Sequence, residues 1–528
     1  MRAAMPNLLA LALLLSLGLS FSILPDLALL LLICGVCHFS LQRMAPAITR
    51  ISGTWLLLLL LIVLADFCLQ RFFGRTLDIK YDLFLLPALK DLTLTALGGW
   101  YAALAVLIVF AIGALCAGGL AYLLRRASSI KLIKAPLIPL LALAYLVSWA
   151  SLDGARDAPL TIRSAEIVAG VAGAIEIVDG DKAFDRRLAF AQSRDLLLPS
   201  GLRQTQDRDV IFVFVESYGR ALWDSSELRA PFAKLQDEFQ SQLAQAGYLS
   251  SSRFVRSSVV GGGSWLAHMT LMSGVPCNQQ LCWEALLASQ VRALPHFFAN
   301  KGYEAVSVLP AMDIDAWPEG AWYGYTRDIW TRQLAYDGWK YSWSPMPDQY
   351  VWLRLDEILF STSSKPIFAE IALTSSHHPF ALLPPYHEGN WDHAALNETL
   401  QAAGRPIGDR TIWVNPQSDD YLRAIQYSLT SSWDFLIEHY ERDGIFIIIG
   451  DHQPPLAVID EDDLPSAHRA DVPIHIVSKD PALHRHLASN GFKNGLFPDE
   501  QPASMPMKDI KAWLLTLLDT RWGASNDS

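Results

Sequence analysis

Cysteine is scarce in this sequence, with six among 528 residues. Four lie in the first third of the chain, at Cys34, Cys37, Cys68 and Cys116. The other two, Cys277 and Cys282, are too few for a zinc site built from four thiolates. In an oxidising compartment we expect these two to form one small disulfide loop.

Charge is also scarce, because Asp, Glu, Lys and Arg make up only 18% of the residues. The net charge of -11 argues against nucleic acid as a partner, since nucleic-acid surfaces are basic. No internal repeat and no low-complexity tract is evident in the sequence.

Hydrophobic residues are abundant, at 52%, and concentrate in residues 1–150. Apolar runs near the ~20 residues that cross a bilayer predict five membrane spans. The runs are 8–21, 24–39, 55–69, 100–124 and 132–149. A cleaved signal peptide is the alternative for the first run, although no convincing cleavage site follows it. We expect a transmembrane region in 1–150, a juxtamembrane linker in 151–206 and a folded domain in 207–528.

Basic residues in short loops mark the cytoplasmic side of a membrane protein. Six follow the second and fourth runs, at Arg43, Arg50, Arg125, Arg126, Lys131 and Lys134. They place the N-terminus inside and everything after Trp149 outside the cytoplasm. The loop 71–91 conflicts with this orientation, because it is also basic and would face outward.

Continuous β-branched and aromatic runs predict buried strands at 210–215, 305–309, 366–373 and 445–449. Amphipathic stretches predict helices at 231–246, 287–301 and 419–442, the second interrupted by Pro295. The alternation of strands and helices indicates an α/β fold, with a mostly parallel central sheet and helices on both faces.

Three glycines, Gly261 to Gly263, precede Ser264 and permit a tight loop. The next ten residues can be helical until Gly274 and Pro276 end the helix. Ser264 then lies at a helix N-terminus, where N–H groups and the helix dipole favour an anion such as phosphate. This position suits a nucleophile, and a plain helix cap is the alternative.

Two predicted strands end in potential metal ligands, Glu216 after the first and Asp451 with His452 after the last. Open α/β sheets bind ligands at the carboxyl ends of their strands, so we expect these side chains to meet. Carboxylates and an imidazole suit one divalent ion, Zn²⁺ or Mn²⁺. With Ser264 as a fourth ligand, the ion would lower the pKa of the serine hydroxyl and make it a nucleophile.

The order of the motifs resembles the lipoteichoic acid synthase-like branch of the alkaline phosphatase/sulfatase superfamily. The motifs are VIFVFVES at 210–217, the Gly-flanked Ser264 with a helix that closes in MSG, TSSHHPF at 374–380 and IIIGDH at 447–452. The resemblance implies a sulfatase-like catalytic domain outside the cytoplasmic membrane of a bacterium. Such enzymes transfer phosphoglycerol, or phosphoethanolamine in a related branch, from a membrane phospholipid to an envelope glycan, lipid or polymer through a covalent phospho-enzyme.

The resemblance also assigns roles to residues. Ser264 is the nucleophile, and it binds the metal together with Glu216, Asp451 and His452. His377, with His378 beside it, is a substrate contact. The Trp-x-Arg motif that holds glycerol phosphate matches Trp330 and Arg332, although Trp352 and Arg354 fit the same pattern. The branch usually has threonine where Ser264 stands, and either hydroxyl can be activated by a metal.

A membrane-anchored sulfatase or phosphodiesterase, with water as the acceptor, is the alternative function. Sulfatases convert a Cys or Ser to formylglycine in a motif with proline at the second following position and arginine at the fourth. Leu266 and His268 stand at those positions, which favours phosphoryl transfer. A non-catalytic sensor or scaffold is a third hypothesis, which the intact metal set argues against.

Three further features have open interpretations. His268 lies four residues after Ser264 on the same helix face, where it protonates a leaving alkoxide, holds a phosphate oxygen or only packs. His475, in a late strand, is a further ligand or, as we favour, an ordinary buried histidine. The aromatic stretch 317–343 is a wall for a sugar or glycerol group, or a surface subdomain.

Overall fold

The computed structural model describes residues 182–522, except 206, 313–316, 342–343, 390, 403–416, 456–457, 460–463 and 501–502, and the single residues 65, 66, 69 and 77. The chain divides into two compact units, 1–70 with 76–181 and 71–75 with 182–528. Apart from 65, 66 and 69, the predicted membrane spans lie outside the described residues. No helix among the described residues is long and apolar enough to cross a membrane.

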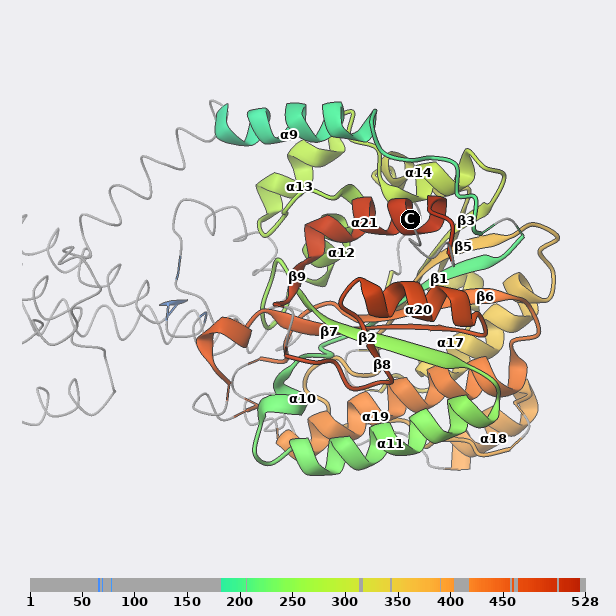
Figure 1. The fold of residues 1–528 in the computed structure, drawn as a ribbon. Coiled ribbons are helices and arrows are strands. Elements are labelled where there is room, and N and C mark those ends of the chain that lie inside the picture. The colour runs from blue at the N-terminus through green and yellow to red at the C-terminus, as the bar shows by residue number, and fades with distance from the viewer. Residues whose placement is uncertain are drawn as a thin grey trace, which may run out of the picture. The chain divides into compact units, whose positions relative to one another are not determined.

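The second unit is built on a nine-stranded sheet (Figure 1). The strand order is β4 (Arg327–Trp330), β3 (Glu304–Leu309), β5 (Ile367–Leu373), β1 (Asp209–Val215), β6 (Gly444–Gly450), β7 (Asp471–Ser478), β2 (Leu249–Arg256), β8 (Lys493–Asn494), and β9 (Met505–Pro506) pairs with β2. The four predicted strands are confirmed as β1, β3, β5 and β6. They pair in parallel, and β1 lies between β5 and β6.

The sheet is mixed: the pairings from β4 through β3, β5 and β1 to β6 are parallel, as predicted, whereas antiparallel pairings follow beyond β6. Strand β7 runs antiparallel to both β6 and β2, and β8 runs antiparallel to β2. The connection from β6 to β7 holds no α-helix among its described residues, so the chain turns back instead of crossing over. Three consecutive serines disrupt the apolar pattern of β2, and their hydroxyls are buried against Gln240, His484 and His475.

Helices cover both faces of the sheet (Figure 1). One layer holds α9 (Lys182–Asp195), α12 (Ser264–Ser273), α13 (Gln280–Leu287), α14 (Leu294–Ala299), α20 (Pro481–Ser489) and α21 (Ile510–Asp519). The other holds α11 (Arg229–Gln245), α17 (Asp348–Leu355), α18 (His393–Ala402) and α19 (Ser418–Asp434). Short helices are α10 (Ala221–Asp224), α15 (Gly320–Tyr323) and α16 (Thr331–Leu334).

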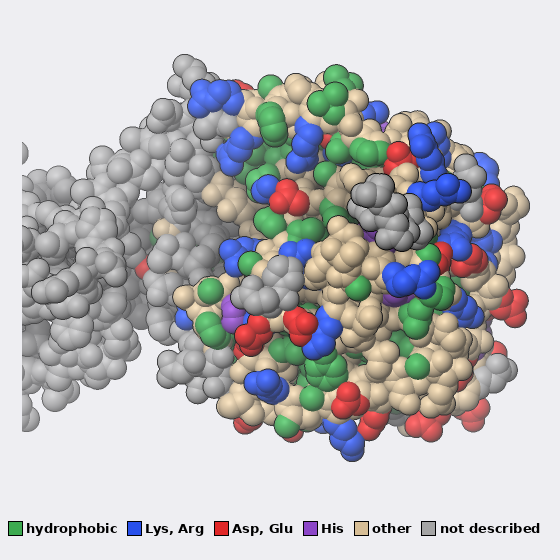
Figure 2. Space-filling view, viewed as in Figure 1, with side chains coloured by type: hydrophobic (Ala, Val, Ile, Leu, Met, Phe, Trp, Pro, Cys, Tyr) green, Lys and Arg blue, Asp and Glu red, His purple; other side chains and the backbone are tan. Residues whose placement is uncertain are grey.

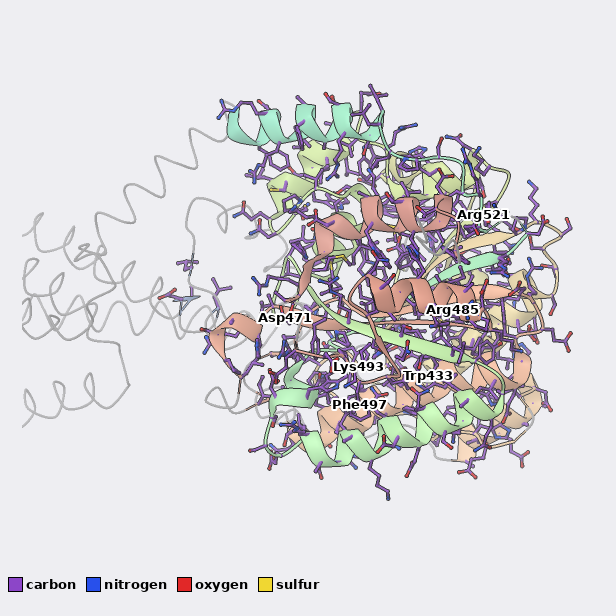
Figure 3. The ribbon with its side chains drawn as sticks, viewed as in Figure 1. Trp433, Asp471, Arg485, Lys493, Phe497 and Arg521 are labelled. Carbon is purple, nitrogen blue, oxygen red and sulfur yellow. The ribbon has the colours of Figure 1, made fainter. Side chains whose placement is uncertain are left out.

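Each helix layer packs on alternate residues of β1. Val210, Phe212 and Phe214 face the layer of α12, whereas the residues between them face the layer of α19. Trp433 of α19, labelled in Figure 3, is fully buried in the core between the sheet and the helix layer of α19. The strand β1 is therefore buried on both sides, as its sequence predicts.

The predicted helices match the structure unequally. Helix α11 confirms 231–246, and α19 covers 419–442 only to Asp434, after which the chain makes one π-helical turn. Within 287–301 only Leu294–Ala299 is a separate helix, and Pro295 lies in its first turn. Proline at that position starts a helix, so it does not interrupt one here.

Helix α9 lies in the predicted linker but packs on the core of this unit through Phe184, Leu188 and Ala191. Its opposite side leaves large apolar side chains in solvent. Phe190 is 69% exposed, and Leu197 just after the helix is 84% exposed. Figure 2 shows acidic and basic side chains interspersed with hydrophobic ones on one face of the described residues, without a continuous field of one sign.

Candidate active site

The end of β1 places the first acidic residue of the site. Glu216 follows the buried strand directly and is itself 8% exposed. Ser217 then adopts a φ of 60°, which is uncommon for any residue except glycine. In this conformation the Ser217 N–H donates to Asp451 Oδ1 at 2.8 Å, so the ends of β1 and β6 are joined.

The glycine loop places Ser264 as predicted. Gly261, Gly262 and Gly263 all have positive φ, at 69°, 149° and 84°. Helix α12 begins at Ser264 and ends before Gly274, whose φ is also positive. Gly263 is the N-cap residue of α12 and Ser264 is the first residue of the helix, so Ser264 does not stand at the cap position. Its hydroxyl instead donates to Glu216 Oε2 at 2.9 Å and lies 3.2 Å from His452 Nε2.

The predicted metal ligands come together. Glu216, Asp451 and His452 are buried, and each offers a ligand atom within 4.8 Å of the others. The Nδ1–H group of His452 donates a hydrogen bond to the backbone carbonyl of Gln453 at 2.7 Å. The other ring nitrogen, Nε2, therefore faces Glu216 and Asp451. Asp451 Oδ1 accepts the N–H groups of Ser217 and His452, and Oδ2 lies 3.5 Å from His452 Nε2.

The three buried groups strongly shift one another's pKa values. Burial opposes the charge on Glu216, but the His452 charge and the bonds from His452 and Ser264 hold its pKa well below the usual range. Burial and the Glu216 charge raise the pKa of Asp451 to about 6. Burial works against a charged His452, yet Asp451 and Glu216 raise its pKa to about 9. At neutral pH, His452 therefore carries a proton that a metal ion must displace.

This donor set fits a divalent cation. Carboxylate oxygens and an imidazole nitrogen are the mixed ligands that Zn²⁺ and Mn²⁺ accept. The Gln453 carbonyl acts as the outer partner that orients a ligating histidine. The oxygen of Ser264 lies within hydrogen-bond distance of two members of the set, so it can be a fourth ligand.

The predicted substrate histidines differ in position. The Ser376 hydroxyl donates to the backbone carbonyl of Glu216 at 2.7 Å, which holds the loop 374–380 beside β1. The positive charge of His377 contributes to the low pKa of Glu216, so His377 lies close to the acids. His378 instead packs edge-on against the buried Phe380, and burial lowers its pKa to about 4.

His268 is held between a carboxylate and an aromatic ring. Its Nδ1 lies 2.6 Å from Glu370 Oε1, and its ring stacks on Phe214 with centroids 3.8 Å apart. The hydroxyl of Tyr325 donates to the second oxygen of the same carboxylate. Sequence reasoning missed Glu370 and Tyr325. An acidic residue inside an otherwise apolar strand was the available signal, because a buried carboxylate is costly unless it is paired.

The Trp-x-Arg candidates are now distinguishable. Trp352 is fully buried and stacks on Phe435, and Arg354 pairs with Glu357. Trp330 is the last residue of the edge strand β4, and Arg332, two residues later, is exposed. Arg332 is therefore the more exposed of the two candidate arginines. Three strand spacings of about 4.8 Å separate β4 from β1, so it is not adjacent to Ser264.

Cys277 and Cys282 are thiols in the structure, so the predicted disulfide is not formed there. Burial raises the pKa of Cys277, and the Cys282 side chain raises it further, which places the two residues beside each other. The disulfide stays a prediction for an oxidising compartment. His475 is wholly buried between Tyr218 and Ser252, which agrees with a structural role.

No family model matches the chain, and no curated protein matches it. Solved structures do. The lipoteichoic acid synthase LtaP from Listeria monocytogenes is 13% identical over 60% of this chain and 74% of that one, with a TM-score of 0.38. The phosphoglycerol transferase GacH from Streptococcus pyogenes, in complex with sn-glycerol-1-phosphate, is 12% identical over 65% and 88%, with a TM-score of 0.37.

The C-terminal periplasmic domain of EcEptC from Escherichia coli is 13% identical over 62% of this chain and 85% of that one, with a TM-score of 0.37. These proteins are of the kind that the motif order resembles.

Proposed function

We propose that this chain is a metal-dependent transferase that moves a phospho-alcohol group from a membrane phospholipid to an envelope glycan, lipid or polymer. Phosphoglycerol is the group we favour, and phosphoethanolamine is the next. The observation that carries the proposal is the contact of Ser264 with Glu216 and His452 at the first turn of α12. It unites a hydroxyl nucleophile, a cation site and a helix N-terminus at one point.

In this proposal each residue of the site has a separate role. The Ser264 oxygen attacks phosphorus, and the α12 N-terminus faces the phosphate with free N–H groups. Glu216, Asp451, His452 and Ser264 would hold the cation. When bound, this cation would lower the pKa of the serine hydroxyl and offset charge on the phosphoryl oxygens. The loop of His377 would orient the phosphate, and the exposed Arg332 would contact the head group.

A location at the membrane surface is part of the proposal. The donor is confined to a bilayer, and an anchored enzyme meets it at a high effective concentration. The apolar runs in 1–150 supply the anchor in this account. The exposed Phe190 and Leu197 on and beside α9 are compatible with a surface that lies near lipid.

The test is release of diacylglycerol by the full chain in nanodiscs that contain phosphatidylglycerol or phosphatidylethanolamine. Replacement of Ser264 by alanine should abolish release, whereas threonine should retain part of it, because its hydroxyl can also be activated. Release that survives Ser264→Ala would refute the proposal. Release that is equal with and without an acceptor, with free phosphoglycerol as product, would identify a hydrolase.

A further inference from the structure

Trp265 leaves a large apolar surface in solvent directly beside the proposed nucleophile. It follows Ser264 in the first turn of α12, and 48% of its surface is exposed. The other residues of the helix, from Leu266 to Ser273, are buried. Tryptophan is a residue that folding usually buries to a large extent. An indole that stays open at the entrance to a reaction centre is therefore a candidate contact for another molecule.

The indole is held in place by the next helix. Nε1 of Trp265 donates to Gln280 Oε1 at 3.2 Å, and the Gln280 amide donates to Glu284 Oε1 at 3.2 Å. Gln280 starts α13, which lies beside α12 (Figure 1). The chain returns along α12 to reach it, because Thr270 Oγ1 bonds both the N–H and the carbonyl of Cys277. The one polar atom of the indole is thus satisfied within the protein, and the exposed part of the ring is apolar.

The segment that leads to Trp265 carries no charge. No Asp, Glu, Lys or Arg occurs in 257–267, between Arg256 and His268. Val259 and Val260 in this segment are half-buried, and the glycines that follow them have no side chains. A surface that a bilayer covers must lack charged groups, since these would lose their hydration there. Tryptophan is itself enriched at the boundary between acyl chains and head groups.

The occupant that fits this surface is a phospholipid bilayer. In the proposed function the phosphorus of the donor must reach the Ser264 oxygen while the acyl chains of the donor stay in the membrane. The head-group layer is only about 5–8 Å thick on each side of the hydrocarbon core. A side chain as long as the indole of Trp265, next to Ser264 in the chain, therefore reaches the acyl boundary when the phosphate reaches the serine.

We propose that Trp265 is a lipid-contact residue whose indole enters the head-group layer of the bilayer beside the donor molecule, and that Gln280 is the positioning residue that holds the ring. The inference rests on the proposed function, because that function brings a bilayer lipid to Ser264. Half of an indole surface is about 100 Å², and burial of this area corresponds to roughly 10-fold to 100-fold in affinity.

The first measurement is fluorescence quenching of the full chain in nanodiscs that contain phosphatidylglycerol and phosphatidylcholine with brominated acyl chains. Trp265→Phe removes one indole of the 17 in the chain, so the signal of wild type minus that of Trp265→Phe reports on Trp265 alone. This difference should be less than about half as large in brominated lipid as in ordinary lipid, because bromine quenches an indole that it contacts. A difference of equal size in both lipids would overturn the inference.

The second measurement is diacylglycerol release as a function of the mole fraction of phosphatidylglycerol in the nanodiscs. Trp265→Ala should raise the half-saturating mole fraction about tenfold, while kcat stays within about twofold of wild type. Gln280→Leu, which cannot accept the indole N–H, should raise it several-fold with kcat likewise retained. Leu249→Ala is the matched control, because Leu249 is 40% exposed and pairs with Ser478 at the end of the sheet opposite to the site. It should change neither quantity.

The outcomes separate this inference from the proposed function. A half-saturating mole fraction in Trp265→Ala like that of wild type, whether or not kcat falls, would overturn the inference. A higher KM for the acceptor with an unchanged donor dependence would assign the indole to the acceptor and would overturn it as well. If wild type releases no diacylglycerol while brominated lipid still quenches Trp265, the proposed function fails and the contact with the bilayer stands.

Discussion

Metal binding at the site should be strongly pH-dependent because of His452. The neighbouring acids raise the pKa of His452 to about 9 in the metal-free protein, although its burial alone would lower it. A cation needs the neutral imidazole, so binding must release this proton. At pH 7 only about 1% of a group with that pKa is neutral, which weakens the apparent affinity about 100-fold. Between about pH 6.5 and pH 8.5, the apparent Kd should fall about tenfold per pH unit.

Asp451 adds a second proton at lower pH. Its pKa is raised to about 6, so it too must lose a proton before it binds a cation in acid solution. Below about pH 6 the dependence should steepen towards 100-fold per pH unit. Both groups weaken cation binding as the pH falls. Each holds its proton more tightly in the folded metal-free protein than an ordinary side chain of its type does, and this proton competes with the cation.

Titration calorimetry with Mn²⁺ on the full chain in detergent, in buffers of different ionisation enthalpy, measures both the affinity and the protons released. The half-exposed His393, which pairs with Glu357 away from the site, provides the control His393→Gln. That variant should keep the slope. A Kd that stays constant between about pH 6.5 and pH 8.5, with no proton released, would refute the ligand role of His452.

Four further predictions concern stability and specificity. Lys511→Met should lower the free energy of unfolding by about 3–5 kcal/mol in a urea titration, because the buried ammonium of Lys511 pairs with Asp195 at 2.6 Å. The control Lys508→Met removes a more exposed ammonium and should change the free energy of unfolding by less than about 0.5 kcal/mol. Gly263→Ala should cost about 1–2 kcal/mol from its φ of 84°, with room for the methyl group, and activity should fall with it. Arg332→Ala should raise the KM for phosphatidylglycerol, and an unchanged KM would exclude the head-group role of Arg332. Alkylation mass spectrometry on protein purified without reductant should find Cys277 and Cys282 blocked if the chain matures in an oxidising compartment, and two alkylated thiols would contradict the disulfide.

Local sequence signals predicted the centre of the site. The apolar run of β1 fixes the place of Glu216, and consecutive glycines before Ser264 can adopt the positive φ values that the loop needs. Asp451 and His452 were predicted in the same way, because they directly follow the apolar strand β6. Each of these signals lies within a few consecutive residues, so it can be recognised in the sequence without the tertiary structure.

Contacts between distant segments could not be predicted in the same way. His268 and Glu370 are 102 residues apart, and only the packing of α12 on β1 and β5 brings them together. The two Trp-x-Arg candidates are equivalent in sequence, and they differ in the structure because Arg354 pairs with Glu357 whereas Arg332 is exposed. The antiparallel side of the sheet was missed because the serines of β2 find hydrogen-bond partners on other elements.

The most direct test of the account is the mass of the tryptic peptide that holds Ser264, after the full chain is quenched during turnover with phosphatidylglycerol and Mn²⁺. The account predicts a phosphoglycerol adduct on Ser264, absent in Ser264→Ala and absent when the cation is removed with a chelator. An unmodified serine during active diacylglycerol release, or a formylglycine at this position, would contradict it.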